Sequence, residues 1–292
     1  MNIDGSVSLK ILGTLQDAGS PHIGCDKECC RDLFVNPDHS RKVVSLGIID
    51  NINSKSFLFD ATPDITSQLM NLFSDSRISP GKIPDGIFIT HAHIGHYTGL
   101  MYLGKEALNS KNTEVYVMPG MKKFLENNSP WDQLIELKNI NLIPLHENIT
   151  VELTSTVKVT PVLVPHRDEF SETVGYKIEG PSKKTLFIPD IDKWGKWERN
   201  IISEIERADY AFLDATFYDE NEIGNSNMKD IPHPFIVESM ELFKNLSETE
   251  KRKIHFIHLN HTNPVLNSGS MQFRNVIENG FNIARKDEIF EL

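Results

Sequence analysis

Three histidines stand close together in the first half of the chain, at His91, His93 and His96. They follow residues 86–90, an apolar run that is typical of a buried β-strand. On an extended segment, side chains two positions apart point to the same side, so His91 and His93 can reach one ion. Because imidazole nitrogen is a preferred ligand of zinc and related metals, the spacing predicts a metal site at a strand end. The alternative is a surface loop that happens to be rich in histidine.

Polar side chains occupy the same kind of position elsewhere in the chain, each at or near the end of an apolar run. These residues are Asp60, His166, Asp190 and the neighbouring pair His258 and His261. Their recurrence favours a metal centre built at strand ends over a single histidine-rich loop.

The strands expected to carry these residues fall into two sets. Short β-type runs lie in the first half at residues 7–12, 43–49, 56–60, 86–90 and 115–118, and in the second half at 157–164, 174–178, 185–188, 211–213 and 254–259. Helical patterns lie between them at 64–73, 120–127, 197–208 and 235–246. Two sets of strands with interspersed helices are typical of a layered α/β protein.

Length, charge and composition limit the other possibilities. The 292 residues contain no Pro/Gly/Ser-rich linker, charge block or internal repeat, so we expect a single domain over residues 1–292. The formal net charge of −11 disfavours nucleic-acid polymers, and we expect a small-molecule substrate. No apolar run is long enough to span a membrane and the first residues lack a signal-peptide pattern, so we expect a cytoplasmic protein. A homodimer is compatible with the sequence.

The motif at residues 91–96 resembles the HxHxDH signature of the metallo-β-lactamase superfamily, and the later strand-end residues come in the order expected for it. Within this superfamily the chain is similar to coenzyme PQQ biosynthesis protein B and its relatives, through residues 13–19, 213–217 and 262–264. The resemblance covers most of the chain. It implies an α/β fold, a four-layer αββα sandwich of the metallo-β-lactamase type, with the metal site along one edge.

The resemblance implies a first metal ion bound by His91, His93 and His166. Three histidine ligands leave a fourth position open for water, which is typical of catalytic rather than structural zinc. Zinc is the expected metal, and manganese or iron is compatible with the same ligands. The biosynthesis protein has largely degenerate metal motifs, with an asparagine where His261 stands here, so this chain resembles a relative that has kept its metal ligands.

The resemblance also implies a second ion, to which Asp190 bridges and which His96 and a histidine of the last motif complete. We favour His261 as that histidine, because ligands of the superfamily sit at the ends of strands. His258 is then a core residue or a residue behind a ligand. The alternatives are a hydrogen-bonding role for His96 and a helix N-cap at Asp190.

Gly95 departs from the superfamily pattern, which has a metal-binding aspartate at this position. Glycine has no side chain to donate, so the second metal site is either weakened or completed by another carboxylate. Asp17, Asp64 and Asp192 are the candidates. The sequence is therefore compatible with one catalytic metal ion and with two.

A metal ion lowers the pKa of a bound water molecule to near 7 and so provides a nucleophile for attack on a carbonyl or phosphorus. The leaving group then needs a proton. The segments around Asp214 and His233 resemble an acidic-Ala-Thr-Phe motif and a later histidine of ribonuclease Z-like members, which implies that His233 is the general acid and that Asp214 orients it. Asp190 is the third expected catalytic residue. The alternative is a helix-entry histidine beside a strand-end carboxylate.

Three cysteines lie together near the N-terminus, at Cys25, Cys29 and Cys30, with His22 just before them. An odd number of closely spaced cysteines does not predict a disulfide framework. The four residues could bind a structural zinc, as in the cysteine-rich loop of PQQ-type relatives, although the adjacent Cys29 and Cys30 do not easily face one ion together. The alternatives are free thiols, and a role for His22 with Asp17 at the mouth of the active site.

Three functions are compatible with these residues. The first is a metal-dependent hydrolase that acts on a small ester or phosphodiester. The second is a cofactor-maturation or oxidative protein like PQQ biosynthesis protein B, for which iron is a compatible metal. The third is a binding protein that has kept the fold without catalysis. Similarity of fold does not carry chemistry by itself, so lactam hydrolysis is not favoured.

Overall fold

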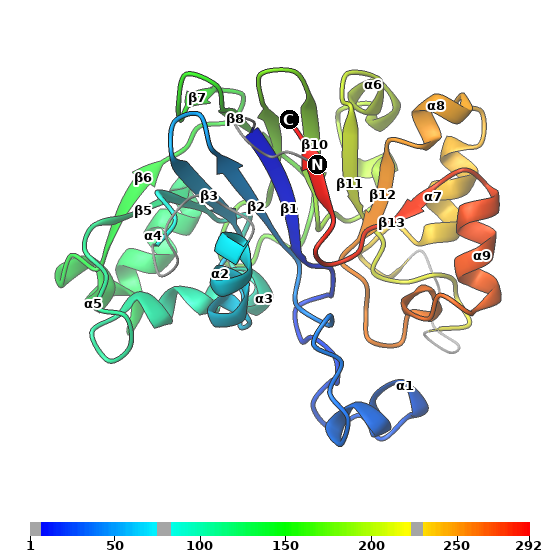
Figure 1. The fold of residues 1–292 in the computed structure, drawn as a ribbon, viewed down its shortest axis with the longest axis horizontal. Helices are drawn as coiled ribbons and strands as arrows, with labels where there is room; N and C mark the ends of the chain where they lie inside the picture. The colour runs from blue at the N-terminus through cyan, green and yellow to red at the C-terminus, as the bar shows by residue number, and fades with distance from the viewer. Residues whose placement is uncertain (1–6, 75–82, 223–229) are drawn as a thin grey trace.

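The computed structural model describes residues 7–74, 83–222 and 230–292, which form two β-sheets packed face to face between helices (Figure 1). In spatial order, the first sheet consists of β14 (Ile289–Glu291), β1 (Val7–Gly13), β2 (Ser45–Asp50), β3 (Lys55–Phe59), β4 (Gly86–Phe88), β5 (Thr113–Val117) and β6 (Ile140–Pro144). The second consists of β13 (Asn282–Ile283), β12 (Ile254–Ile257), β11 (Tyr210–Asp214), β10 (Lys184–Ile188), β9 (Val174–Glu179), β8 (Lys158–Leu163) and β7 (Val151–Glu152).

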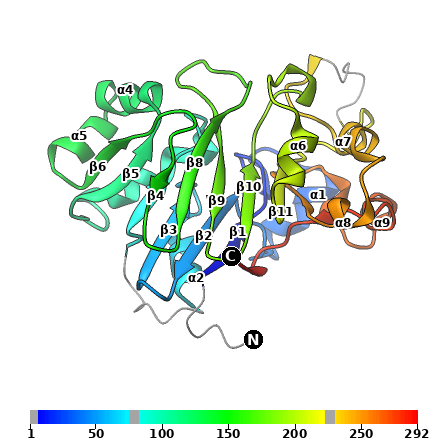
Figure 2. The same ribbon diagram turned by 90° about the horizontal axis from the view of Figure 1, so that it is seen from above.

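Helices cover the outer faces of both sheets (Figures 1 and 2). On the side of the first sheet lie α2 (Ile65–Ser74), α4 (Pro119–Asn127) and α5 (Trp131–Glu136), and on the side of the second lie α6 (Ile201–Glu206), α7 (Ile236–Phe243), α8 (Glu248–Lys251) and α9 (Met271–Glu278). The short α3 (Ile94–Tyr97) follows β4, and the segment that carries α1 (Glu28–Arg31) projects away from the sheets. Among the described residues, no helix has both the length and the apolar character that crossing a membrane requires.

Side chains alternate between the two faces of each sheet and thereby fill three hydrophobic cores. In β3, Phe57 and Phe59 contribute to the core between the sheets, whereas Leu58 packs with the helices outside the first sheet. In β10, Phe187 contributes to the central core, whereas its neighbours Leu186 and Ile188 pack with the helices outside the second sheet. This alternation is the two-residue period of a strand that is buried on both faces. Three cores between four layers confirm the predicted αββα sandwich.

The strands that precede the candidate ligands all end at one rim of the sandwich. In the first sheet β3 and β4 are parallel, and β1 runs in the same direction because only the antiparallel β2 separates it from β3. In the second sheet β10, β11 and β12 are parallel, and β8 runs with them because β9 is antiparallel to both β8 and β10. A bridge between Leu15, just after β1, and Leu259, just after β12, joins the two sheets at this rim. Loops at the carboxyl ends of strands are where open α/β sheets bind ligands.

The predicted elements differ from the observed ones mainly at their ends. The helix expected at residues 197–208 begins later, because the side chain of Asn200 caps α6 by accepting hydrogen bonds from the backbone of Ile202 and Ser203. The strand expected to reach Leu259 ends at Ile257, because the next residue, His258, has a positive φ of 64°. The strand β6 and the helix α9 were not predicted.

Phe59 offers a test of the central core. It is fully buried, and its ring lies 4.9 Å from that of Phe88, 5.3 Å from that of Tyr176 and 6.4 Å from that of Phe187 between ring centroids. Phe59→Ala removes these contacts and leaves a cavity, so we expect the free energy of unfolding to fall by about 3–5 kcal/mol. Urea denaturation followed by circular dichroism measures it. The same truncation at the exposed Phe34 is the control, and equal losses for both variants would contradict this description of the core.

Candidate metal centre

The first group of possible metal ligands comprises His91, His93, His166 and Asp190, whose ligand atoms lie within 4.8 Å of one another. The Oδ2 atom of Asp190 is 3.2 Å from Nε2 of His166 and 3.4 Å from Nε2 of His91. Nδ1 of His93 is 3.3 Å from Nε2 of His166. Three imidazoles and a carboxylate that surround one small volume form a ligand set that suits zinc.

A second group lies beside the first and shares Asp190 with it. It comprises Asp17, His96, Asp190 and His258. Nε2 of His96 is 2.9 Å from Oδ1 of Asp17, and Nε2 of His258 is 3.6 Å from the same oxygen. Both nitrogens lie near Oδ2 of Asp190, at 4.0 Å for His96 and 3.8 Å for His258. The same oxygen of Asp190 therefore faces both groups, as a bridging ligand does.

Hydrogen bonds on the far side of the histidine rings select the nitrogen that each ring presents to the centre. Asp60 Oδ2 lies 2.7 Å from Nδ1 of His96, and Thr216 Oγ1 lies 2.8 Å from Nδ1 of His258. In His93 the arrangement is reversed, because Glu169 Oε2 lies 3.1 Å from Nε2 and leaves Nδ1 for the centre. Such partners orient metal-binding histidines and raise their basicity.

Asp60 and His258 both have backbone conformations that residues other than glycine seldom adopt, with φ of 66° and 64°. Such conformations cost on the order of 1–3 kcal/mol and persist where the surroundings hold them. Asp60 is held by the backbone N–H and the hydroxyl of Thr90, at 2.8 and 3.0 Å from its Oδ1 atom. These bonds tie the end of β3 to the segment that leads into His91.

Several buried polar atoms at the centre have no hydrogen-bond partner within the protein. They are Nε2 of His91, His96 and His258, Oδ1 of Asp17 and Oδ1 of Asp190. Leaving a buried donor or acceptor unpaired costs about 1–3 kcal/mol each. A divalent cation bonded to these nitrogens and carboxylates would remove that cost, so the residues present fit a metal.

The pKa values of the centre reflect burial and the proximity of its charges. Burial lowers the pKa of His91 well below its ordinary value, with a smaller contribution from His96, and so favours the neutral form that binds metals. Burial opposes protonation of His258 as well, but the carboxylates of Asp190, Asp17 and Asp214 together outweigh it and raise the pKa of His258 to about 9. The carboxylates thus stabilise nearby positive charge, and a metal ion can supply that charge in place of protons on the histidines.

A third arrangement, between Asp214 and His233, lies against the first two. Nδ1 of His233 is 2.9 Å from Oδ2 of Asp214 and 3.2 Å from Oδ1 of Asp190. The backbone N–H groups of Ile191 and Thr216 donate to Asp214 and hold its carboxylate in place. Because the carboxylates hold Nδ1, the nitrogen of His233 that remains for a substrate is Nε2.

The structure brings most of the predicted ligands together and places two differently. His91, His93, His96, His166 and Asp190 all lie in the two groups. His258, rather than the favoured His261, lies beside Asp190, because β12 ends early and the turn at His258 directs this residue into the rim. The sequence offered both histidines, and only the end of the strand distinguishes them.

His261 instead joins Cys25, Cys29 and Cys30 in a group of four possible ligands within 4.8 Å of one another. The Sγ atom of Cys29 lies 3.8 Å from Sγ of Cys25 and 3.9 Å from Sγ of Cys30. The two adjacent cysteines therefore do face the same point. His22, which the sequence suggested as the fourth ligand, is not in this group. Its ring stacks on that of His261 at 4.4 Å between centroids. Three cysteines and a histidine suit a structural zinc.

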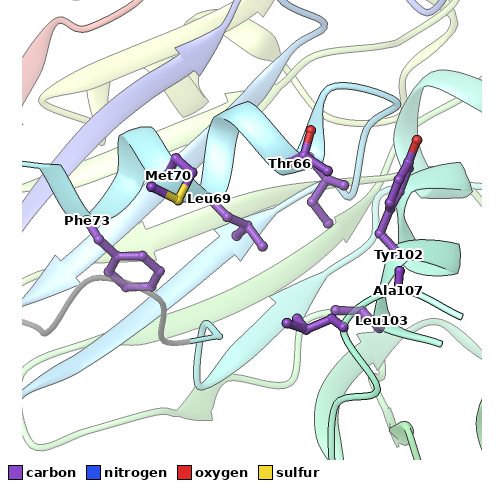
Figure 3. A pocket seen from close by; sticks show the side chains of 9 residues that line it. Thr66, Leu69, Met70, Phe73, Tyr102, Leu103 and Ala107 are labelled. Carbon is purple, nitrogen blue, oxygen red and sulfur yellow. The ribbon is translucent and has the colours of Figure 1, made fainter. Parts of the chain in front are cut away.

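An apolar hollow of about 320 Å³ lies elsewhere, between α2 and the 3₁₀ turn η2 (Thr98–Leu103). Leu69, Met70 and Phe73 of α2 face Tyr102 and Leu103 across it (Figure 3). None of the residues that line it is charged or a histidine. The hollow therefore lacks the metal ligands and charged groups that gather at the rim.

Comparison with known families identifies the class to which this fold and centre belong. A family model for the beta-lactamase superfamily domain matches residues 55–258, more than half of the chain. The chain therefore belongs to the metallo-β-lactamase superfamily. Within it, the chain is 25% identical to coenzyme PQQ synthesis protein B of Acinetobacter baylyi over 289 residues, 90% of this chain and 93% of the relative.

Solved structures agree with this assignment. Zinc-bound PqqB from Methylobacterium extorquens has a TM-score of 0.79 at 21% identity, with 98% of this chain and 100% of that chain covered. A diphosphatase of the PhnP family has a TM-score of 0.70 at 20% identity, with 98% of this chain and 97% of that chain covered. At these identities the likeness shows the shared fold.

Removal of a ligand from the first group tests the histidine centre. We expect His93→Ala to lose about one metal ion per chain relative to the wild type, because one of three imidazoles is missing. Plasma mass spectrometry of protein purified without added metal measures the content. His146→Ala, at an exposed histidine outside the centre, is the control. Unchanged metal content in His93→Ala would contradict the assignment.

A separate measurement tests the cysteine group. We expect Cys25→Ala to lose one zinc ion per chain while the metal lost in His93→Ala is retained, because the two groups share no ligand. Metal content of the two single variants and the double variant provides the comparison. Loss of the same ion in both single variants would show that the groups are not independent.

Proposed function

We propose that this protein is a metal-dependent hydrolase that cleaves a small phosphodiester or ester with water as the nucleophile. The observation that carries the proposal is the position of Asp190. Its Oδ2 atom faces both groups of possible metal ligands, while its Oδ1 atom lies 3.2 Å from the ring of His233. Groups that can hold a metal and a group that can donate a proton therefore meet at one carboxylate.

The residues of the centre divide the work of hydrolysis between them. His91, His93 and His166 would hold a metal ion, which when bound would activate a water molecule and polarise the scissile group. The chain's own contribution is the position of these imidazoles, and hydrogen bonds between Thr90 and His91 and between Glu169 and His93 occupy the ring nitrogen that faces away from the centre. The site lies among buried side chains, which strengthens electrostatic interactions with the reacting atoms.

His233 is suited to donate the proton that the leaving group needs. Burial lowers its pKa, but the carboxylates of Asp214 and Asp190 outweigh burial and raise the pKa to about 10. The ring is therefore protonated at neutral pH. Asp214 is itself fixed by two backbone N–H groups, so it keeps Nδ1 occupied and leaves Nε2 as the donor.

The fold likeness to a PhnP-family diphosphatase supports phosphorus ester chemistry as the first choice. A small substrate also agrees with the overall charge of −11, which repels long polyanions but leaves a single phosphate to be attracted by bound cations.

A second candidate function is oxidative chemistry or cofactor maturation with iron. One observation favours it: the second group has two histidines, His96 and His258, beside two carboxylates, and so contains the two histidines and one carboxylate that non-haem iron oxygenases use. The 25% identity to coenzyme PQQ synthesis protein B points the same way. Oxygen consumption by the iron-loaded protein would favour this candidate over hydrolysis.

The two candidates are separated by assays on one preparation. Protein loaded with zinc, manganese or iron is tested for release of p-nitrophenol from bis(p-nitrophenyl) phosphate and from p-nitrophenyl acetate, and for oxygen uptake. Metal-dependent hydrolysis that disappears in His91→Ala supports the proposal. Metal-loaded protein that hydrolyses neither compound contradicts it.

The role of His233 predicts a leaving-group effect. We expect His233→Gln to lower kcat for an aryl phosphodiester by about 100- to 10,000-fold. The loss should be smaller when p-nitrophenol is the leaving group and larger when phenol is, because the poorer leaving group depends more on the proton donor. Steady-state kinetics with both substrates measures it. His146→Gln is the matched control. An equal loss for both leaving groups would contradict a general-acid role.

A further inference from the structure

Gly95 lies against Asp17, although the two are far apart in the sequence. A Cβ atom built on Gly95 would lie 2.4 Å from Cα of Asp17, 2.5 Å from its Oδ1 atom and 2.9 Å from its Cβ atom. These are far inside van der Waals contact, and two of the three atoms belong to parts of the residue that cannot rotate away. Position 95 therefore cannot carry a side chain while Asp17 stays where it is.

Asp17 is held in this place by the backbone on both sides of the rim. The N–H of Gln16 donates to the carbonyl of Leu259 at 2.9 Å, and the N–H of Leu259 donates to the carbonyl of Thr14 at 2.8 Å. These bonds fix the residue before Asp17 to the residue after His258. The side chain of Asp17 is only 12% exposed, and its Oδ1 atom points to the nitrogens of His96 and His258 without a hydrogen-bond partner.

The other carboxylates that could replace an aspartate at position 95 are occupied elsewhere. Asp64 accepts from Nζ of Lys42 and from the backbone N–H of Val43, both at 2.9 Å. Asp192 accepts from Nζ of Lys196 at 2.6 Å. Neither belongs to a group of possible metal ligands in the described part of the chain.

We propose that Asp17 supplies the carboxylate of the second metal site in place of the aspartate that the superfamily motif has at position 95, and that position 95 is glycine because Asp17 occupies its space. The ligand comes from the loop after β1 rather than from the segment after β4, but its oxygen reaches the same pair of histidines. The inference rests on the proposed function only in treating the histidine centre as a metal site.

The exchange makes a reciprocal prediction about metal binding. The wild type is expected to bind two Mn²⁺ ions per chain at the centre, since manganese prefers nitrogen and oxygen ligands to the thiols of the cysteine group. Asp17→Asn keeps the shape of the side chain but removes its charge, and we expect the affinity for one ion to fall by at least about 10- to 100-fold. Gly95→Asp alone is expected to weaken the same ion, because the two side chains collide.

Asp17→Gly combined with Gly95→Asp moves the carboxylate back to the motif position. We expect this double variant to recover the second ion that Asp17→Gly alone loses. Free Mn²⁺ is counted by electron paramagnetic resonance during titration, and circular dichroism confirms that each variant is folded. Asp64→Asn, which removes a carboxylate between β3 and α2 that is bonded to Lys42, is the matched control and is expected to keep both ions.

The outcome is independent of catalysis. Loss of one ion in folded Asp17→Asn supports the ligand assignment even if no substrate is hydrolysed. A wild type with a single ion at the centre, or a folded Asp17→Asn variant that binds the second ion as tightly as the wild type, overturns it even if hydrolysis is found.

Discussion

The carboxylate of Asp190 is the constraint on which this molecule depends. It is only 2% exposed, and a buried carboxylate needs nearby donors or cations to be tolerated. Both sheets supply them at one rim: the segment after β4 brings His91 and His96, and the segments after β8 and β12 bring His166 and His258. The sandwich therefore brings loops from two sheets together around the buried carboxylate of Asp190.

Around that charge, hydrogen bonds from behind support His96 and His258. Asp60 links Thr90 to His96, and Thr216 links His258 to the carboxylate of Asp214 through hydrogen bonds of 2.8 Å. Since the hydroxyl of Thr216 gives its single proton to Asp214, it accepts the proton on Nδ1 of His258, which leaves Nε2 free to bind a cation. Rigid support of this kind keeps the separation between the two ligand groups and the proton donor constant.

Local patterns predicted a layered α/β protein and the nearness of His91 and His93, whereas the αββα sandwich and the inclusion of His166 in the first ligand group came from the resemblance to the superfamily. Apolar runs reveal the strands, and His91 and His93 are close in sequence as well as in space. The other assignments depend on how distant segments meet. Whether His258 or His261 enters the rim turns on one positive φ, and the preference for Asp17 over Asp64 turns on a bridge between residues 15 and 259. His261 likewise lies with cysteines that are far from it in the sequence, a contact that no local pattern encodes.

The wide spread of the ligands along the chain has a consequence for the order of folding. Asp17 lies near the start of the described residues and His258 near their end, so the second group exists only after strands from both halves have paired and the two sheets have docked. Contacts so distant in sequence form slowly and late. A metal ion that binds this group selects fully assembled molecules and stabilises them against unfolding, which makes metal retention a reporter of completed folding in this chain.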